Sequence, residues 1–111
     1  MPVAISEGRK TNRALALTLE KLAQSIHQLH ECDASWVESV PVNETHEGRT
    51  VWQGIVHVFR LTGHPTAKLC YGWASPTDSG ERVYAVLHLP PVSSPADAVR
   101  ASIVSDFRQG R

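Results

Sequence analysis

Four short runs rich in β-branched and aromatic residues follow one another between two amphipathic helical segments. The runs are predicted to be strands, at residues 34–42, 51–61, 68–75 and 82–89. Short connections of this kind join neighbouring antiparallel strands. Because helices and strands are segregated along the chain, the sequence predicts an α+β fold: a helix, a four-stranded antiparallel meander and a second helix.

The first helical segment is predicted from residue 11 to about residue 30. Its large apolar residues recur at spacings of three and four, which places them on one face of a helix: Leu15, Leu19, Leu22, Ile26 and Leu29. Thr11 or Asn12 is the expected N-cap. Residues 1–10 are expected to form a flexible N-terminal arm before a single domain at residues 11–111.

The second helical segment is predicted to follow Ser94 and to run to about residue 108. Ser94 is the expected N-cap, Pro95 suits the first helical position, and Asp97 completes a pattern that resembles a capping box. Val99, Ile103 and Phe107 form its expected buried face. Both helices are expected to pack on the same face of the sheet.

The simplest hairpin registers divide the strand residues between two faces. With Leu61 opposite Leu69 and Trp73 opposite Val83, one face is nearly all apolar and is expected to carry the helices. This assignment depends on the pairing, because a shift of one residue turns a strand over. The other face then exposes an aromatic and β-branched surface formed by Trp52, Val56, Val58, Tyr84 and Val86.

That second face is the predicted binding surface, because exposed apolar patches mark contact sites. Three functions remain open for it: self-association as a dimer, binding of a partner or ligand, and binding of nucleic acid through stacked aromatics with basic residues at the margins. The main expectation is a non-enzymatic protein that self-associates or binds a partner. The candidate residues are Trp52, Val58, Arg60, Tyr84, His88 and His64.

The distribution of charge disfavours nucleic acid as the partner. Lys and Arg total 11 and Asp and Glu total 11, so the formal net charge is zero. The charges are nevertheless segregated: residues 31–47 hold five carboxylates and no Lys or Arg, and residues 48–77 hold three basic residues and no carboxylate. An acidic region beside a basic one favours self-complementary docking.

A small enzyme or small-molecule binder is the alternative from another class. Its expected pocket lies near His57, His64 and Trp73, with Tyr71 beside them. The more economical interpretation of His57 is a hydrogen-bonded core histidine whose pKa is lowered by desolvation. Cys70 is likewise expected to be a small buried hydrophobe rather than a nucleophile.

No metal site or cofactor is expected. The spacing of His27, His30 and Glu31 allows a shared metal, but a solvated helix end is the favoured interpretation. Cys32 and Cys70 form no CxxC pattern, which is consistent with reduced thiols in a cytoplasmic protein. The chain has no apolar run long enough to span a membrane and no secretory h-region, so no membrane association is expected.

Several blocks resemble a family of small uncharacterised proteobacterial accessory proteins, including those of integron gene cassettes, a class of mobile element. The blocks are VWQGIVHVF at residues 51–59, LTGHP at 61–65, CYGW at 70–73 and YAVLHLPPV at 84–92. The resemblance covers about residues 36–104. It implies a small cytoplasmic α+β protein that oligomerises, and it implies no activity and no catalytic residues.

Overall fold

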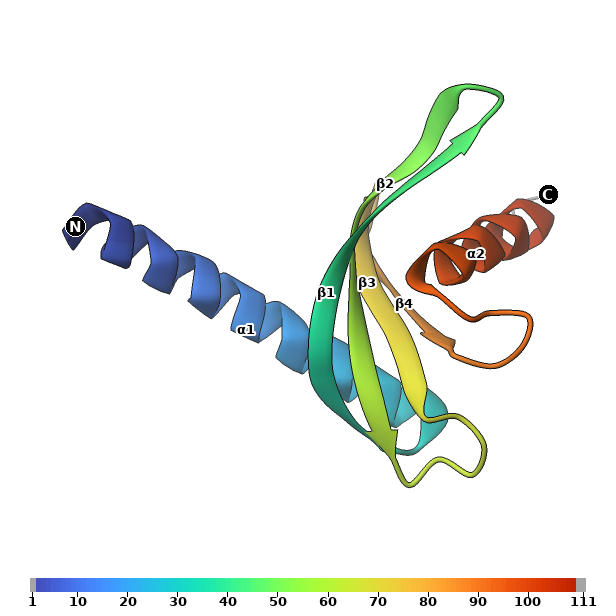
Figure 1. The fold of residues 1–111 in the computed structure, drawn as a ribbon, viewed down its shortest axis with the longest axis horizontal. Coiled ribbons are helices and arrows are strands. Elements are labelled where there is room, and N and C mark those ends of the chain that lie inside the picture. The colour runs from blue at the N-terminus through green and yellow to red at the C-terminus, as the bar shows by residue number, and fades with distance from the viewer. Residues whose placement is uncertain (1, 110–111) are drawn as a thin grey trace.

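The computed structural model describes residues 2–109, and it describes the side chains of residues 13–107. Figure 1 shows a four-stranded antiparallel sheet flanked by two helices. The strand order is the order of the sequence, so the predicted α+β meander is confirmed. The elements are α1 (Pro2–His30), β1 (Asp33–His46), β2 (Arg49–Thr62), β3 (Leu69–Thr77), β4 (Gly80–Leu87) and α2 (Pro95–Gln109).

Helix α1 is longer than the sequence predicts. It begins at Pro2, so most of the expected arm at residues 1–10 is helical, and Thr11 and Asn12 lie inside the helix. Proline is tolerated in a first helical turn because the N–H that it lacks has no partner there. In Figure 1 the N-terminal half of α1 extends well beyond the sheet.

The two helices pack on opposite faces of the sheet (Figure 1). On β2, Val56 and Val58 belong to the core formed with α2, whereas Phe59 and Leu61 belong to the core formed with α1. Successive side chains of a strand point to opposite faces, so these two cores lie on the two sides of one sheet. The prediction that both helices share a face is therefore wrong.

The pairing of β3 explains part of this difference. Leu69 lies opposite Arg60 and Trp73 lies opposite Tyr84, and each pairing is one residue away from the register expected from the sequence. A shift of one residue exchanges the faces of a strand. The side chains of Tyr71 and Trp73 consequently lie on the α2 side of the sheet. The face that was expected to be exposed is instead the face against which α2 packs.

An aromatic cluster fills the core under α2. The ring of Trp73 stacks on Tyr84 with 5.1 Å between centroids and 7° between planes, and Trp52 meets Trp73 edge to face at 5.8 Å. A Cβ on Gly54 would lie 2.9 Å from the ring of Trp52. Glycine at this position therefore lets Trp52 lie over its own strand.

Helix α2 is anchored at its N-terminus as the sequence predicts. The N–H of Asp97 donates to Ser94 Oγ at 3.1 Å, which confirms Ser94 as the N-cap. Asp97 Oδ2 accepts from the N–H and the hydroxyl of Ser93, one residue before the expected partner. Arg100 then forms an ion pair with Glu44 of β1, with Nε 2.7 Å from Oε1. This pair joins α2 to the outer part of the β1–β2 hairpin.

The two edges of the sheet differ. Edge strand β1 contains Pro41 and two irregularities of register, between Trp36 and Glu38 and between Glu44 and Thr45. Proline and bulges in an edge strand discourage further pairing. Edge strand β4 pairs with β3 in an unbroken register from end to end.

Candidate functional site

The side of the β1–β2 hairpin that faces away from α2 is left uncovered. Helix α1 packs on this side of the sheet through Leu19, Leu22, Ala23 and Ile26, all in its C-terminal half. Farther along the hairpin, Trp36 of β1 and Ile55 of β2 remain 46% and 48% exposed. With Ser39 and His57 between them, these residues form the surface that we call the hairpin patch: Trp36, Ser39, Ile55 and His57.

A chain of hydrogen bonds orders the hairpin patch. The indole N–H of Trp36 donates to Ser39 Oγ at 3.1 Å, and the Ser39 hydroxyl lies 2.7 Å from His57 Nδ1. His57 is only 8% exposed, and this burial lowers its pKa. The contact with His57 Nδ1 fixes the Ser39 hydroxyl, so the indole that donates to this hydroxyl is held in one orientation before any partner arrives. Such preorganisation lowers the entropic cost of binding.

A serine beside a histidine also matches the first two members of a catalytic triad. A serine nucleophile needs a base that is itself oriented by a third group. Among the described side chains, no carboxylate forms a hydrogen bond with His57. The hydrogen bonds observed give Ser39 and His57 a structural role in the patch.

Two further exposed valines accompany the patch along the hairpin. Val37 and Val51 have no opposite residue in the pairing register, and each is about half exposed. Both lie at the register irregularities, where an extra residue in one strand is left unpaired. The hairpin thus presents large apolar side chains on both strands.

The aromatic and β-branched surface predicted as the binding site is covered by α2. Val58 is 4% exposed in the core under α2, and Trp52 and Tyr84 are half-buried in the same cluster. Their expected exposure is wrong, because it placed α2 on the opposite face. Tyr84 instead donates its hydroxyl to Asp106 of α2 at 2.6 Å.

The other candidate residues lie apart from one another. Arg60 is exposed on β2. His88 Nδ1 forms a hydrogen bond with the hydroxyl group of Tyr71, and the two atoms lie 2.5 Å apart. His64 lies in the β2–β3 loop, where its Nδ1 accepts from the N–H groups of Thr66 and Ala67. These contacts give His64 and His88 roles in ordering the chain.

The pocket expected near His57, His64 and Trp73 does not form as predicted. His57 lies on the α1 side of the sheet and Trp73 lies on the α2 side with Tyr71. The same change of register that turned β3 over separates them. The sheet therefore stands between the residues that this pocket would need.

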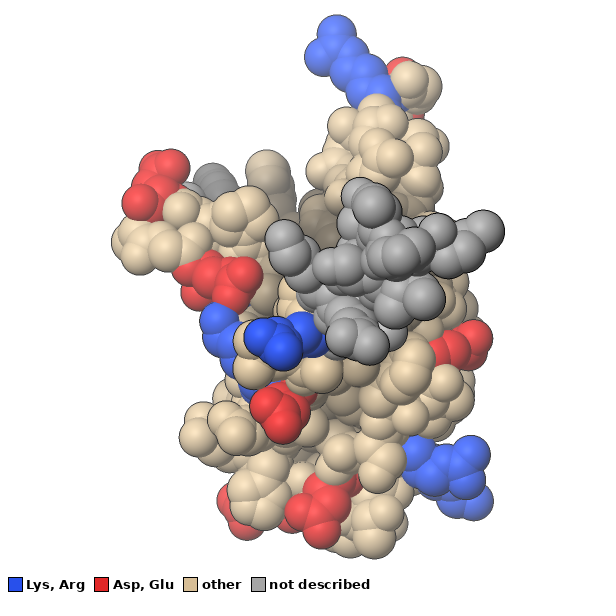
Figure 2. All heavy atoms as spheres, turned by 90° about the vertical axis from the view of Figure 1, so that its left-hand side faces the viewer, with Lys and Arg blue, Asp and Glu red and all other residues tan. Residues whose placement is uncertain are grey.

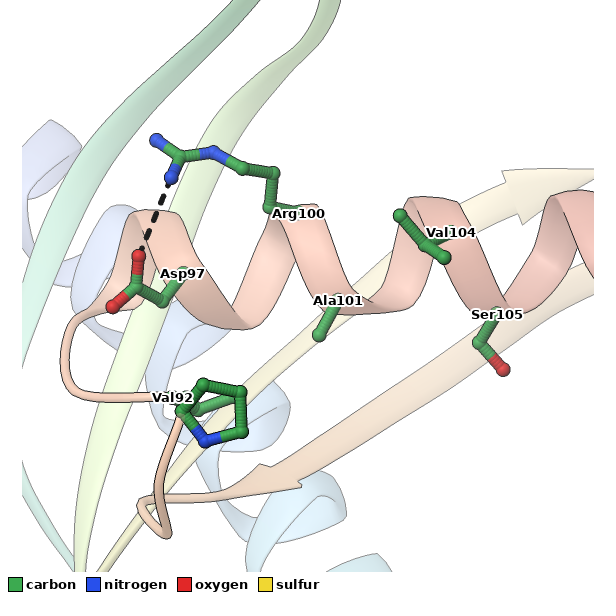
Figure 3. A pocket seen from close by; sticks show the side chains of 7 residues that line it. Val92, Asp97, Arg100, Ala101, Val104 and Ser105 are labelled. Atoms are coloured by element: carbon green, nitrogen blue, oxygen red, sulfur yellow. Dashed lines mark hydrogen bonds and ion pairs between the residues drawn. The ribbon is translucent and has the colours of Figure 1, made fainter.

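A shallow groove of about 600 Å³ runs along the outer side of α2. Figure 3 shows Val104 and Ala101 along it, with Asp97 and Arg100 paired at one end. Asp97 is held by Ser93, and Arg100 by Glu44. Because both charged groups already serve the fold, the groove offers a ligand little beyond apolar contact.

The described residues contain no group of three His, Cys, Asp or Glu side chains placed to hold a metal ion. His27 Nδ1 lies 3.3 Å from the carbonyl of Cys32, and His30 Nε2 lies 3.1 Å from the carbonyl of Ala85. Burial raises the pKa of Cys70 to about 12, with smaller contributions from Cys32 and from a hydrogen bond to Tyr71 that opposes the shift. Cys70 is therefore a protonated core residue.

Figure 2 views the molecule from the end where α1 projects. Lys and Arg alternate with Asp and Glu on this side, with wide areas of neither. A surface that follows a nucleic-acid backbone gathers its basic residues into one groove or stripe. The coloured part of this view has no such stripe. Within residues 2–109, no helix has the length and apolar character that a membrane span requires.

Comparison with known proteins gives no match, whether with protein-family models, with curated proteins or with solved structures.

Proposed function

We propose that this protein acts by binding rather than by catalysis, and that it self-associates through the hairpin patch. The observation that carries the proposal is the exposure of Trp36 and Ile55 on adjacent strands, outside the core formed with α1. Exposed apolar patches mark contact surfaces, and closed dimers are the commonest assembly of soluble chains. The proposal places the protein in the cytoplasm, where its two buried free cysteines would stay reduced.

Charge supports a self-complementary contact. The stretch from Glu31 to Glu47, which includes β1, carries five carboxylates and no Lys or Arg. Residues 48–77, which include β2, carry three Lys or Arg residues and no carboxylate. In a two-fold contact each copy presents both strands, so the acidic strand of one copy can face the basic strand of the other.

Sedimentation equilibrium at micromolar concentrations tests the proposal. The wild-type chain is expected to sediment at twice its 12.2 kDa mass. Ile55→Asp places a charge in the contact and is expected to give a monomer, with circular dichroism confirming that it folds. Val104→Asp on α2 is the matched control, because Val104 is also 48% exposed but lies on the other side of the sheet. A wild-type monomer, or equal behaviour of both variants, would contradict the proposal.

Binding of a different protein through the same patch is the second candidate. It rests on the same preorganised Trp36 side chain, because rigid aromatic residues are typical anchors of protein interfaces. A wild-type monomer that is otherwise folded would favour this candidate over self-association.

A further inference from the structure

The free edge of β4 offers unpaired main-chain groups. The N–H of His88 donates to the carbonyl of Leu69, its opposite residue, at 2.9 Å. In an antiparallel ladder, residues that bond across the pair alternate with residues whose N–H and C=O point away. The main-chain N–H and C=O groups of Tyr84 and Val86 therefore point toward β3. The main-chain groups of Val83 and Ala85 point outward, away from the sheet.

A groove lies between this edge and α2. Five consecutive residues of β4, from Arg82 to Val86, form one wall. The other wall is one side of α2, formed by Ala101, Ser102, Ser105 and Asp106. The groove has a volume of about 330 Å³. Its α2 wall carries small side chains at three of these four positions, which leaves room for a main chain beside the strand.

The two edge strands differ in how they are protected from pairing with a further strand, and β4 is the less protected of the two. Natural edge strands are protected from pairing by proline, bulges or covering elements. Edge strand β1 has Pro41 and two register irregularities, and β4 has neither within its paired length, Gly80–Leu87. The outward carbonyl of Ala85 meets the side chain of His30 of α1.

We propose that the β4–α2 groove binds an extended peptide segment of another protein by strand addition. The peptide lies beside β4 as a fifth strand, and its main chain bonds to the outward N–H and C=O groups of Val83 and Ala85. Strand addition next to a helix combines main-chain hydrogen bonds for affinity with side-chain contacts for specificity. This inference is independent of the hairpin patch.

A single strand fits this place better than a second copy of the sheet. Helix α2 stands on one side of the edge, and α1 reaches the other side through Lys21, which forms an ion pair with Glu81, and through His30 at Ala85. A sheet that brought its own two helices would meet these helices on both faces. A peptide without helices meets neither obstacle.

The groove also defines the side chains that the peptide carries. Alternate residues of a strand point to the same face, so every second peptide side chain would face α2. There it would meet Ala101 and Ser102 beside Val86 and Tyr84, which suits small or medium apolar groups. At the other end, Arg82 lies 3.2 Å from Asp106 and 5.0 Å above the ring of Tyr84, and this arrangement favours a polar residue.

His30 sets the limit of the binding site. Its Nε2 lies 3.1 Å from the Ala85 carbonyl, which can accept a second hydrogen bond. The peptide therefore shares this carbonyl with His30 rather than replacing it. His30→Ala is expected to leave the peptide affinity within a factor of three or so, because the remaining main-chain bonds are unaffected.

The test uses peptides selected from a random phage-displayed library against the full chain. A selected peptide, made synthetically, is titrated into ¹⁵N-labelled protein. The amide signals of Val83 and Ala85 are expected to shift and to gain protection from hydrogen exchange. Ala85→Pro removes an outward N–H without removing a bond to β3, and it is expected to weaken the affinity at least tenfold, as about 1.4 kcal/mol corresponds to tenfold.

A second variant tests the groove in case Ala85→Pro does not fold. Ser105→Trp fills the groove from the side of α2 without altering β4, and it is expected to weaken binding equally. Ser35→Trp, at an exposed position of β1, is the matched control and should bind as the wild type does. Failure to select any peptide, or selection of peptides that bind Ala85→Pro and Ser105→Trp normally, overturns the proposal.

Sedimentation distinguishes a peptide bound at the β4 edge from a second copy of the chain paired with that edge, because the second copy doubles the mass. The Ile55→Asp variant, in which the hairpin patch is blocked, is sedimented with and without Ala85→Pro. If Ile55→Asp remains a dimer and the added Ala85→Pro makes it monomeric, the β4 edge pairs with itself and the peptide proposal is wrong. If Ile55→Asp is monomeric and still binds the selected peptide, both proposals stand separately.

Discussion

The two faces of the sheet are similar in apolar content and different in how far they are covered. Under α2, the core extends from Val92 to Val42 and Trp52 of the hairpin. On the α1 side, the core ends near Phe59. Trp36, which lies opposite Phe59, and Ile55, farther along β2, stay half exposed. The difference shows that the position of a helix, rather than the residues of a strand, decides which apolar side chains become core and which become surface.

The attachment of the two helices explains the difference. Helix α2 follows β4 closely, is capped by Ser94, and is tied by Arg100 to Glu44 of the hairpin. Helix α1 crosses the sheet near its own C-terminal end and extends away from the hairpin (Figure 1). One helix is therefore fixed along the hairpin, and the other leaves it free.

Truncating a side chain in the core under α2 is expected to change the free energy of unfolding more than any other substitution considered for this comparison. Trp73→Ala removes a side chain that is 2% exposed and stacked on Tyr84, and we expect the free energy of unfolding to fall by about 3–5 kcal/mol. Ile55→Ala on the uncovered face is expected to cost less than about 1 kcal/mol. Urea unfolding followed by circular dichroism measures both. Equal losses would mean that the two faces are equally packed.

Thiol reactivity tests where the coverage by α1 ends. Burial raises the pKa of Cys70 to about 12, so the thiol stays protonated at mildly alkaline pH and is closed off from solvent. We expect labelling of Cys70 by iodoacetamide to require unfolding, which makes it slower by several orders of magnitude than in the denatured chain. Rapid labelling of the native protein would show that α1 opens from the sheet.

The hydrogen bond between Tyr84 and Asp106 gives a smaller effect. Tyr84→Phe keeps the ring stacked on Trp73 and removes the hydroxyl that donates to Asp106. We expect the free energy of unfolding to fall by about 1 kcal/mol, because Arg82 still pairs with Asp106. A loss as large as that of Trp73→Ala would mean that this bond, rather than apolar packing, fixes α2.

The smallest effect concerns the pH dependence contributed by His57. Burial lowers its pKa in the folded protein below the ordinary 6.5. Between the two pKa values the unfolded chain binds more protons, so the free energy of unfolding rises with pH there and falls on acidification below about 6.5. We expect His57→Gln to flatten this slope in urea unfolding. An unchanged slope in His57→Gln would contradict the burial of His57.

Much of the fold could be predicted from the sequence. The order of elements and the cap at Ser94 both follow from local patterns that act within a few residues. The face assignment could not, because it depends on the register of β3, which two loops determine. The uninterrupted run from Val56 to Phe59 was the available signal, since strands buried on both faces lack alternation.

The hairpin patch was only partly accessible from the sequence. Alternation correctly placed His57 with Ile55 on one face, but Trp36 stayed outside the candidate list. The bulge beside Trp36 shifts the register of β1 by one residue, and such an irregularity has no clear pattern in a single sequence. The β4–α2 groove was hidden for another reason: it needs α2 on the face that the predicted arrangement left empty.

The tight turn at the end of the hairpin offers a practical handle on the molecule. Glu47 and Gly48 both have positive φ, at 53° and 80°, and their side of the hairpin projects into solvent (Figure 1). Exposed loop tips of this kind tolerate inserted sequence. A short biotin-acceptor peptide placed between these residues would fix the protein on a sensor surface by its tip. The β4–α2 groove would then face the flowing solution in a known orientation.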